Sequence, residues 1–91
     1  MQIELTVPAM LKHCTGEQRH VWLEASRLDE ALAQAQQRYP LLVPHVWDEH
    51  GHVRKHIMVF YNEQSIGWLG SLNVELKQGD RLQIVQAVSG G

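Results

Sequence analysis

The chain has 91 residues, of which 44% are hydrophobic and 20% are charged, and its formal net charge is −2. This length supports one domain with a modest core and leaves little room for an enclosed active site, which argues against a self-sufficient enzyme. The small negative charge offers no basic surface for nucleic acid or an anionic membrane, and no apolar stretch is long enough to span a bilayer.

The N-terminal residues 1–5 have neither the basic nor the apolar region of an export signal. The single cysteine, Cys14, has no partner for an internal disulfide. We therefore expect a cytoplasmic protein that is not stabilised by disulfide bridges.

Two alternating runs predict an N-terminal hairpin. Apolar and polar residues alternate over residues 3–7, as in a half-buried strand, and Pro8 ends the run. Residues 15–18 have the composition of a turn, and a second alternating run follows at residues 20–24. Because the two runs are adjacent in sequence, we expect them to pair antiparallel.

One amphipathic helix is predicted over residues 27–39, with polar residues on the face opposite its apolar side. Ser26 and Asp29 have the spacing of a capping box at its start, and Pro40 stops it. The apolar positions at helical spacing are Leu28, Ala31, Leu32, Ala35 and Tyr39.

The second half of the chain predicts two further strands. Residues 41–47 are apolar but interrupted by a proline, so an irregular crossing is expected. Residues 57–61 are continuously apolar, as in a central strand with both faces occupied. Residues 67–75 indicate short helical turns, and a Gly-Asp turn leads into the last strand at 81–88.

This order predicts an α+β domain over residues 1–88, a β-grasp with one main helix on one face of a mixed sheet of four to five strands. The first and last strands are expected to pair in parallel at the centre, with the helix in the crossover between them. Residues 89–91 are expected to form a flexible Ser-Gly-Gly tail.

The terminal pair Gly90-Gly91 is suited to threading. Without Cβ atoms, the tail passes through a channel too narrow for other residues, and its reactive group is the α-carboxylate of Gly91. Ser89 through Gly91 extend about 10 Å at about 3.3–3.6 Å per residue. A frayed end or the remnant of a purification tag is the alternative interpretation.

Three features of the chain resemble the ubiquitin-like sulfur-carrier family that contains the MoaD and ThiS proteins. They are the β-grasp order, the stretch Leu72-x3-Leu76-x2-Gly79-Asp80, and Ala87-Val88-Ser89-Gly90-Gly91 at the terminus. The opening Val7-Pro8-x2-Leu11-x3-Thr15-Gly16-x-Gln18 is most similar to the CysO-type carriers, which serve cysteine synthesis. Residues 85–87 lack the aromatic and the prolines typical of the molybdopterin branch, which argues against a molybdenum-cofactor role.

The resemblance implies a carrier without catalytic residues or a bound cofactor. A partner of the E1-like type uses ATP to adenylate Gly91, sulfide equivalents displace AMP, and the resulting thiocarboxylate donates sulfur to an acceptor enzyme. A cysteine synthase is one candidate for that acceptor, and a metalloprotease that processes the C-terminus is another expected partner.

Two other groups of reactive side chains do not predict a site. Four histidines at positions 45, 50, 52 and 56 lie near two acidic residues, but they flank a turn as in a solvated hairpin tip, so no metal site is predicted. Cys14 has no activating histidine or aspartate placed by sequence spacing, so we interpret it as a bystander in a loop.

A partner surface is expected on the open face of the sheet. If the odd-numbered residues of 57–61 face the helix, Met58 and Phe60 face outward, and Trp22 is likewise out of phase with its buried neighbours. Grouped apolar residues there would form a docking patch. The alternative is that residues 41–47 fold back and cover them.

The sequence is also compatible with two alternative functions. A ubiquitin-like modifier would use the same adenylate to form an isopeptide bond between Gly91 and a lysine. A non-covalent β-grasp interaction module would keep its function after the diglycine is removed.

Overall fold

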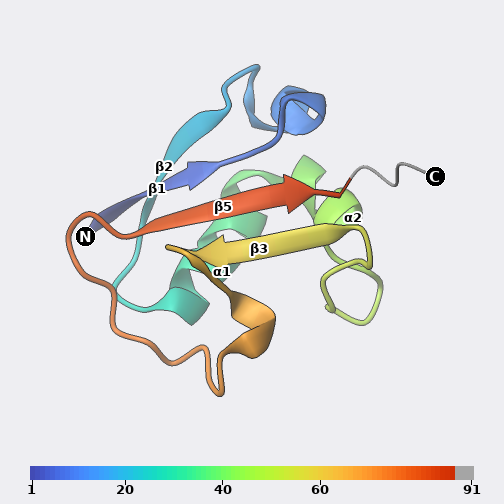
Figure 1. Ribbon diagram of the computed structural model, residues 1–91. Helices are drawn as coiled ribbons and strands as arrows, with labels where there is room; N and C mark the ends of the chain where they lie inside the picture. The colour runs from blue at the N-terminus through green and yellow to red at the C-terminus, as the bar shows by residue number, and fades with distance from the viewer. Residues whose placement is uncertain (88–91) are drawn as a thin grey trace.

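The computed structural model describes residues 1–87, which form a five-stranded sheet with its main helix, α1, packed on one face (Figure 1). The strands lie in the order β2-β1-β5-β3-β4. Their bounds are β1 Gln2–Thr6, β2 His20–Glu24, β3 Ile57–Tyr61, β4 Gln64–Ser65 and β5 Arg81–Gln86. The short β4 extends the sheet beyond the strands that alternation alone predicts.

The first and last strands pair in parallel at the middle of the sheet, as predicted. Leu5 of β1 lies opposite Leu82 of β5 in the parallel pair, and opposite Val21 of β2 in the antiparallel hairpin. On its other edge β5 pairs antiparallel with β3, where Val59 faces Ile84. The mixed sheet and its crossover helix confirm the α+β, ubiquitin-like β-grasp fold.

The helix α1 spans Leu28–Arg38 and packs its apolar side against the sheet. Leu28, Ala31 and Ala35 are buried in the core, and Leu32 packs against them half-buried. Because two of these buried residues are alanines with small side chains, the backbone of α1 can approach the strands closely. The helical interpretation of residues 27–39 is confirmed to within one residue at each end.

The predicted capping box at the start of α1 is wrong. The N-cap is Arg27, whose side chain makes no capping hydrogen bond. The first free N–H groups instead donate to backbone carbonyls of the later segment: Leu28 N to Val74 O at 2.9 Å, and Asp29 N to Leu72 O at 3.1 Å. Because these contacts satisfy donors that a cap would otherwise serve, Ser26 is not needed there.

Several short helical turns connect the main elements. Residues expected to be irregular form the 3₁₀ turn η2, Pro40–Leu42, and the four-residue helix α2, Val43–Val46. A proline fits the first turn of α2, where its missing N–H costs no hydrogen bond. The helical part of the 67–75 stretch is confined to the 3₁₀ turn η3, Ile66–Trp68.

A further 3₁₀ helix, η1, spans Ala9–Thr15 between β1 and β2 and was not predicted from sequence. It ends at Gly16, whose φ of 69° lies in the left-handed region. The buried Thr15 donates its hydroxyl hydrogen to the carbonyl of Gln18, which holds the expected Thr-Gly turn.

The core is one cluster between the sheet and its helices, and its fully buried leucine and isoleucine residues come from β1, β2, α1, η2 and β5. They are Ile3, Leu5, Leu23, Leu28, Leu42 and Leu82. Among residues 1–87, no helix has the length and apolar character that crossing a membrane requires.

Candidate functional site

The strand that carries the C-terminus is held from both sides. β5 lies between β1 and β3, and its residues Leu82 and Ile84 are buried. The ladder continues to the last described residue, since Ala87 N donates to His56 O at 2.7 Å. The predicted tail residues Ser89, Gly90 and Gly91 follow and lie outside the described residues.

The β3 side chains point inward and outward as alternation predicts. Val59 is 2% exposed and faces the core, whereas Met58 is 42% exposed and Phe60 is half-buried on the opposite side. Met58 lies opposite Val85 of β5, and Phe60 lies opposite Gln83. The apolar side chains of this face therefore border the strand that leads into the tail.

A tryptophan that the sequence analysis did not select joins this face. Trp68, in η3, is 83% exposed and lines a groove of about 320 Å³ together with Met58 and Phe60. The rest of the groove is polar and comes from Glu63, Gln64 and Ser65. The signal in the sequence was a tryptophan next to a glycine in a turn-forming stretch, where few neighbours are available to bury it. We call Met58, Phe60 and Trp68 the apolar patch.

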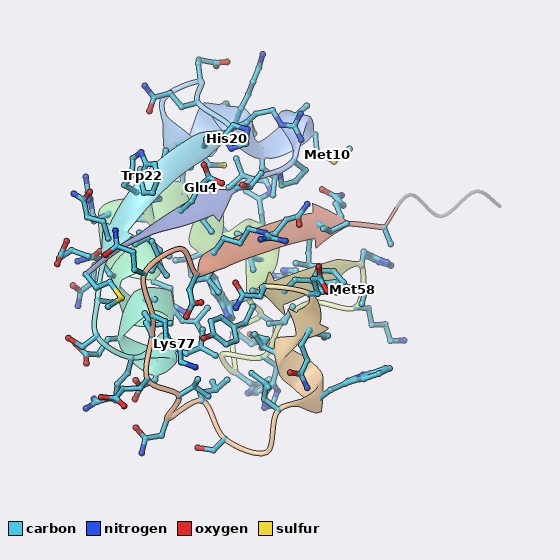
Figure 2. The ribbon with its side chains drawn as sticks, turned by 60° about the vertical axis from the view of Figure 1, so that its left-hand side comes forward. Glu4, Met10, His20, Trp22, Met58 and Lys77 are labelled. Atoms are coloured by element: carbon cyan, nitrogen blue, oxygen red, sulfur yellow. The ribbon has the colours of Figure 1, made fainter. Side chains whose placement is uncertain are left out.

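Trp22 does not belong to this patch, so the prediction of one grouped surface is wrong in this respect. Trp22 is 55% exposed on β2 and lies opposite Glu4 of β1, which lies opposite Arg81 of β5. Figure 2 shows Trp22 and Met58 apart on the sheet. Three strand spacings of about 4.8 Å separate β2 from β3, or about 14 Å. Alternation along a strand predicts which face of the sheet a side chain lies on, but not how far apart two side chains on that face are.

The segment expected as a possible cover lies elsewhere. Leu42, Val46 and Trp47 are buried in the core cluster with Val59, on the side of the sheet that holds α1. Met58 and Trp68 remain exposed. The interpretation that residues 41–47 cover the open face is therefore wrong.

The turn that begins β5 is fixed by a carboxylate. Asp80 accepts hydrogen bonds from Tyr61 Oη at 2.5 Å, from Lys77 N at 2.8 Å and from Asn62 Nδ2 at 3.2 Å. Burial by itself raises the pKa of Asp80, but these hydrogen bonds outweigh it and hold the pKa below its usual value. Burial, followed by the bond to Asp80, raises the pKa of Tyr61 to about 12. The cluster ties the last strand to the end of β3.

The histidines near residue 50 form a hairpin tip, as interpreted from sequence. Asp48 Oδ1 accepts from the backbone nitrogens of His50 and His52 at 2.8 and 2.9 Å. Those hydrogen bonds, led by the one from His52, lower the pKa of Asp48. The two imidazole rings are exposed with centroids 6.4 Å apart, and among the described residues no third ligand joins them.

Cys14 is less isolated than its spacing in the sequence suggests. It is buried in η1, and burial raises the pKa of its thiol, which disfavours a thiolate nucleophile. The structure nevertheless brings His13 and His45 to it, although His45 lies in α2, far along the chain. Sequence reasoning missed this group because it considered the histidines at 45–56 separately from Cys14.

Comparison with known proteins matches the ThiS family model to residues 5–91. The sulfur carrier protein CysO of Mycobacterium tuberculosis is 23% identical over 93 residues, which cover 100% of both chains. Two solved structures are each 26% identical to the chain. SAMP1 from Haloferax volcanii has a TM-score of 0.78 and covers 100% of both chains. The Amycolatopsis orientalis BexX/CysO complex has a TM-score of 0.80 and covers 98% of this chain and 99% of that one.

Proposed function

Because the chain belongs to the ThiS family, whose members are small sulfur carriers, we propose that it carries sulfur as a thiocarboxylate on Gly91. The observation that supports this most directly is that the family match runs through residue 91 and includes the Gly90-Gly91 pair. In this function the protein is a cosubstrate, and the catalytic groups belong to its partner enzymes.

Activation has to precede sulfur transfer, because a free carboxylate is a poor electrophile. An E1-like partner adenylates Gly91 with ATP and releases pyrophosphate. A sulfide equivalent then attacks the carbonyl carbon, the new C–S bond forms, the C–O bond to AMP breaks, and AMP leaves. The small residues Ser89 and Gly90 let the tail enter the narrow site where this happens.

The apolar patch is the surface we propose for the activating enzyme. Trp68 and Met58 are well exposed, and aromatic and methionine side chains are enriched at the centres of protein interfaces. Met58 also lies opposite Val85, next to the strand that leads into the tail. A partner bound there lies beside the end of β5, whereas Trp22 lies three strands away on β2.

A more specific form of this proposal is that the sulfur acceptor is an enzyme of cysteine synthesis. It is supported by similarity to CysO at full length and by the pattern of residues 7–18. The A. orientalis CysO structure is a complex with BexX, so a carrier that is 26% identical to this chain binds a partner protein.

The experiment is intact-protein mass spectrometry after incubation with ATP, the activating enzyme and a sulfide source. We expect the mass increase of one sulfur replacing one oxygen, confined to the C-terminal fragment after proteolysis. Deletion of Gly91 removes this increase, while Ser89→Ala, which keeps the tail length and a small side chain, retains it.

The proposal is contradicted if the unmodified chain gains no sulfur under conditions that convert a known carrier with the same activating enzyme. Circular dichroism of the Gly91 deletion serves as the folding control, because a native spectrum ties the lost reaction to the missing carboxylate.

A second candidate function is a protein modifier. It is favoured by the full-length similarity to SAMP1, a small archaeal modifier protein. The same adenylate would then be captured by a lysine amine to give an isopeptide bond. Blots of cells that express a tagged chain distinguish the two, since only conjugation produces a ladder that resists reducing agent and needs Gly91.

A further inference from the structure

A thiol and two imidazoles meet where η1 approaches α2. His13 and Cys14 lie near the end of η1, and His45 lies in α2. One ligand atom from each residue lies within 4.8 Å of the other two. The His13 and His45 rings are 5.7 Å apart and nearly perpendicular, so they are not stacked.

The spacing of two of these atoms matches one edge of a tetrahedral metal site. With Zn–S of about 2.3 Å and Zn–N of about 2.05 Å, two tetrahedral ligands lie about 3.6 Å apart. Cys14 Sγ and His13 Nε2 are 3.5 Å apart. That distance fits one edge of a zinc tetrahedron, with the ion off the line that joins the two atoms. The ligand atom of His45 lies within 4.8 Å of both, so binding draws His45 toward the ion.

The chemistry of the donors restricts which ion fits. Thiolate and imidazole favour zinc over magnesium and calcium, which take oxygen ligands. The sulfur is buried while both histidines are exposed, so an ion can approach from solvent and reach the thiol. Three protein ligands leave a fourth tetrahedral position for water or an external ligand.

We propose that His13, Cys14 and His45 form a Zn²⁺ site. When the Zn–S bond forms, the Cys14 thiol releases its proton to solvent, and the ion links η1 to α2 across a long stretch of chain. The site uses none of the tail residues and no residue of the apolar patch. The zinc proposal therefore goes beyond sulfur transfer, and its test is independent of the test of sulfur transfer.

The test is titration of the full-length, reduced chain, purified without a histidine tag, with Co²⁺ as a spectroscopic substitute for Zn²⁺. We expect a thiolate-to-cobalt charge-transfer band that saturates at one equivalent, with visible bands of tetrahedral cobalt, and that disappears when Zn²⁺ is added. Zn²⁺ also raises the melting temperature of the chain, because it binds the folded state, where the three ligands are held together, more tightly than the unfolded state. Magnesium at the same concentration changes neither signal.

Variants identify the ligands. Cys14→Ala removes the charge-transfer band, and His45→Gln weakens binding about tenfold or more, since even loss of an outer contact typically costs 10–100-fold. The matched control is His50→Gln with His52→Gln, which removes two exposed histidines and leaves the titration unchanged. His45 is exposed, so His45→Gln tests the site even if the buried Cys14→Ala variant does not fold.

The inference is overturned if the unmodified chain gives no charge-transfer band, in which case the short S···N distance is a hydrogen bond alone. It is also overturned if His45→Gln binds as tightly as the unmodified chain, or if the control variant loses the metal.

Discussion

Val59 and Met58 are neighbours on β3 with opposite facings. We expect substitution of Val59 to lower stability and substitution of Met58 to weaken binding to the activating enzyme. Val59 is 2% exposed, so Val59→Ala removes two buried methyl groups and leaves a cavity. At about 0.8 kcal/mol per methyl plus a cavity contribution, we expect a loss of about 2 kcal/mol in the free energy of unfolding. For a domain of this size that lowers the melting temperature by about 10 °C. Binding to the activating enzyme is expected to be unchanged for the folded fraction.

Met58→Asp is expected to weaken binding to the activating enzyme with little loss of stability. Met58 is 42% exposed on the open face, so the stability cost is about 1 kcal/mol or less. A charge left unpaired in a dry interface costs about 2–4 kcal/mol of binding, which is about 30- to 1,000-fold in Kd. Phe60→Asp is expected to weaken binding in the same direction.

Trp22→Asp is the matched control, with the same new charge on the same face but three strands away from Met58. Urea denaturation and calorimetric titration with the activating enzyme measure both effects. An unchanged Kd for Met58→Asp, or a Trp22→Asp variant that loses as much affinity, would show that the partner binds elsewhere.

Three further predictions concern stability and titration. Because the folded pKa of Asp80 is lowered, its contribution to stability is full above the unfolded pKa of about 3.9 and is lost as the pH falls through the folded pKa. Asp80→Asn should therefore flatten the fall in melting temperature below about pH 4, and parallel curves would contradict this. Tyr61, with its pKa raised to about 12, stabilises the fold below the ordinary tyrosine pKa of about 10 and loses this contribution as the pH rises through about 12. Ultraviolet titration should show a late step that is absent in Tyr61→Phe, and the prediction is refuted if the step that Tyr61→Phe removes lies near the ordinary pKa of about 10. Gly16→Ala should cost about 1–2 kcal/mol because its φ is 69°, whereas Gly70→Ala, with open space and no positive φ, should be silent in thermal melts.

The apolar pattern was sufficient to predict most of the fold. Alternation over residues 3–7 and 20–24 fixes which side chains face inward, because a strand has a strict period of two. The helical period of residues 27–39 predicts α1 in the same way. The 3₁₀ helix η1 carries no such period, since short turns are set by contacts with the rest of the chain, and it was missed.

The sequence by itself determined the family, the inward and outward residues of β3, and the C-terminal Gly-Gly that carries the proposed chemistry. These are local properties, readable from residue type and short spacing. Only the tertiary structure decided that Trp22 lies apart from Met58, that carbonyls of residues 72 and 74 cap α1, and that His45 meets Cys14. Each of these findings depends on strand order or on contacts between segments far apart in sequence. A local period in the sequence encodes neither strand order nor such contacts.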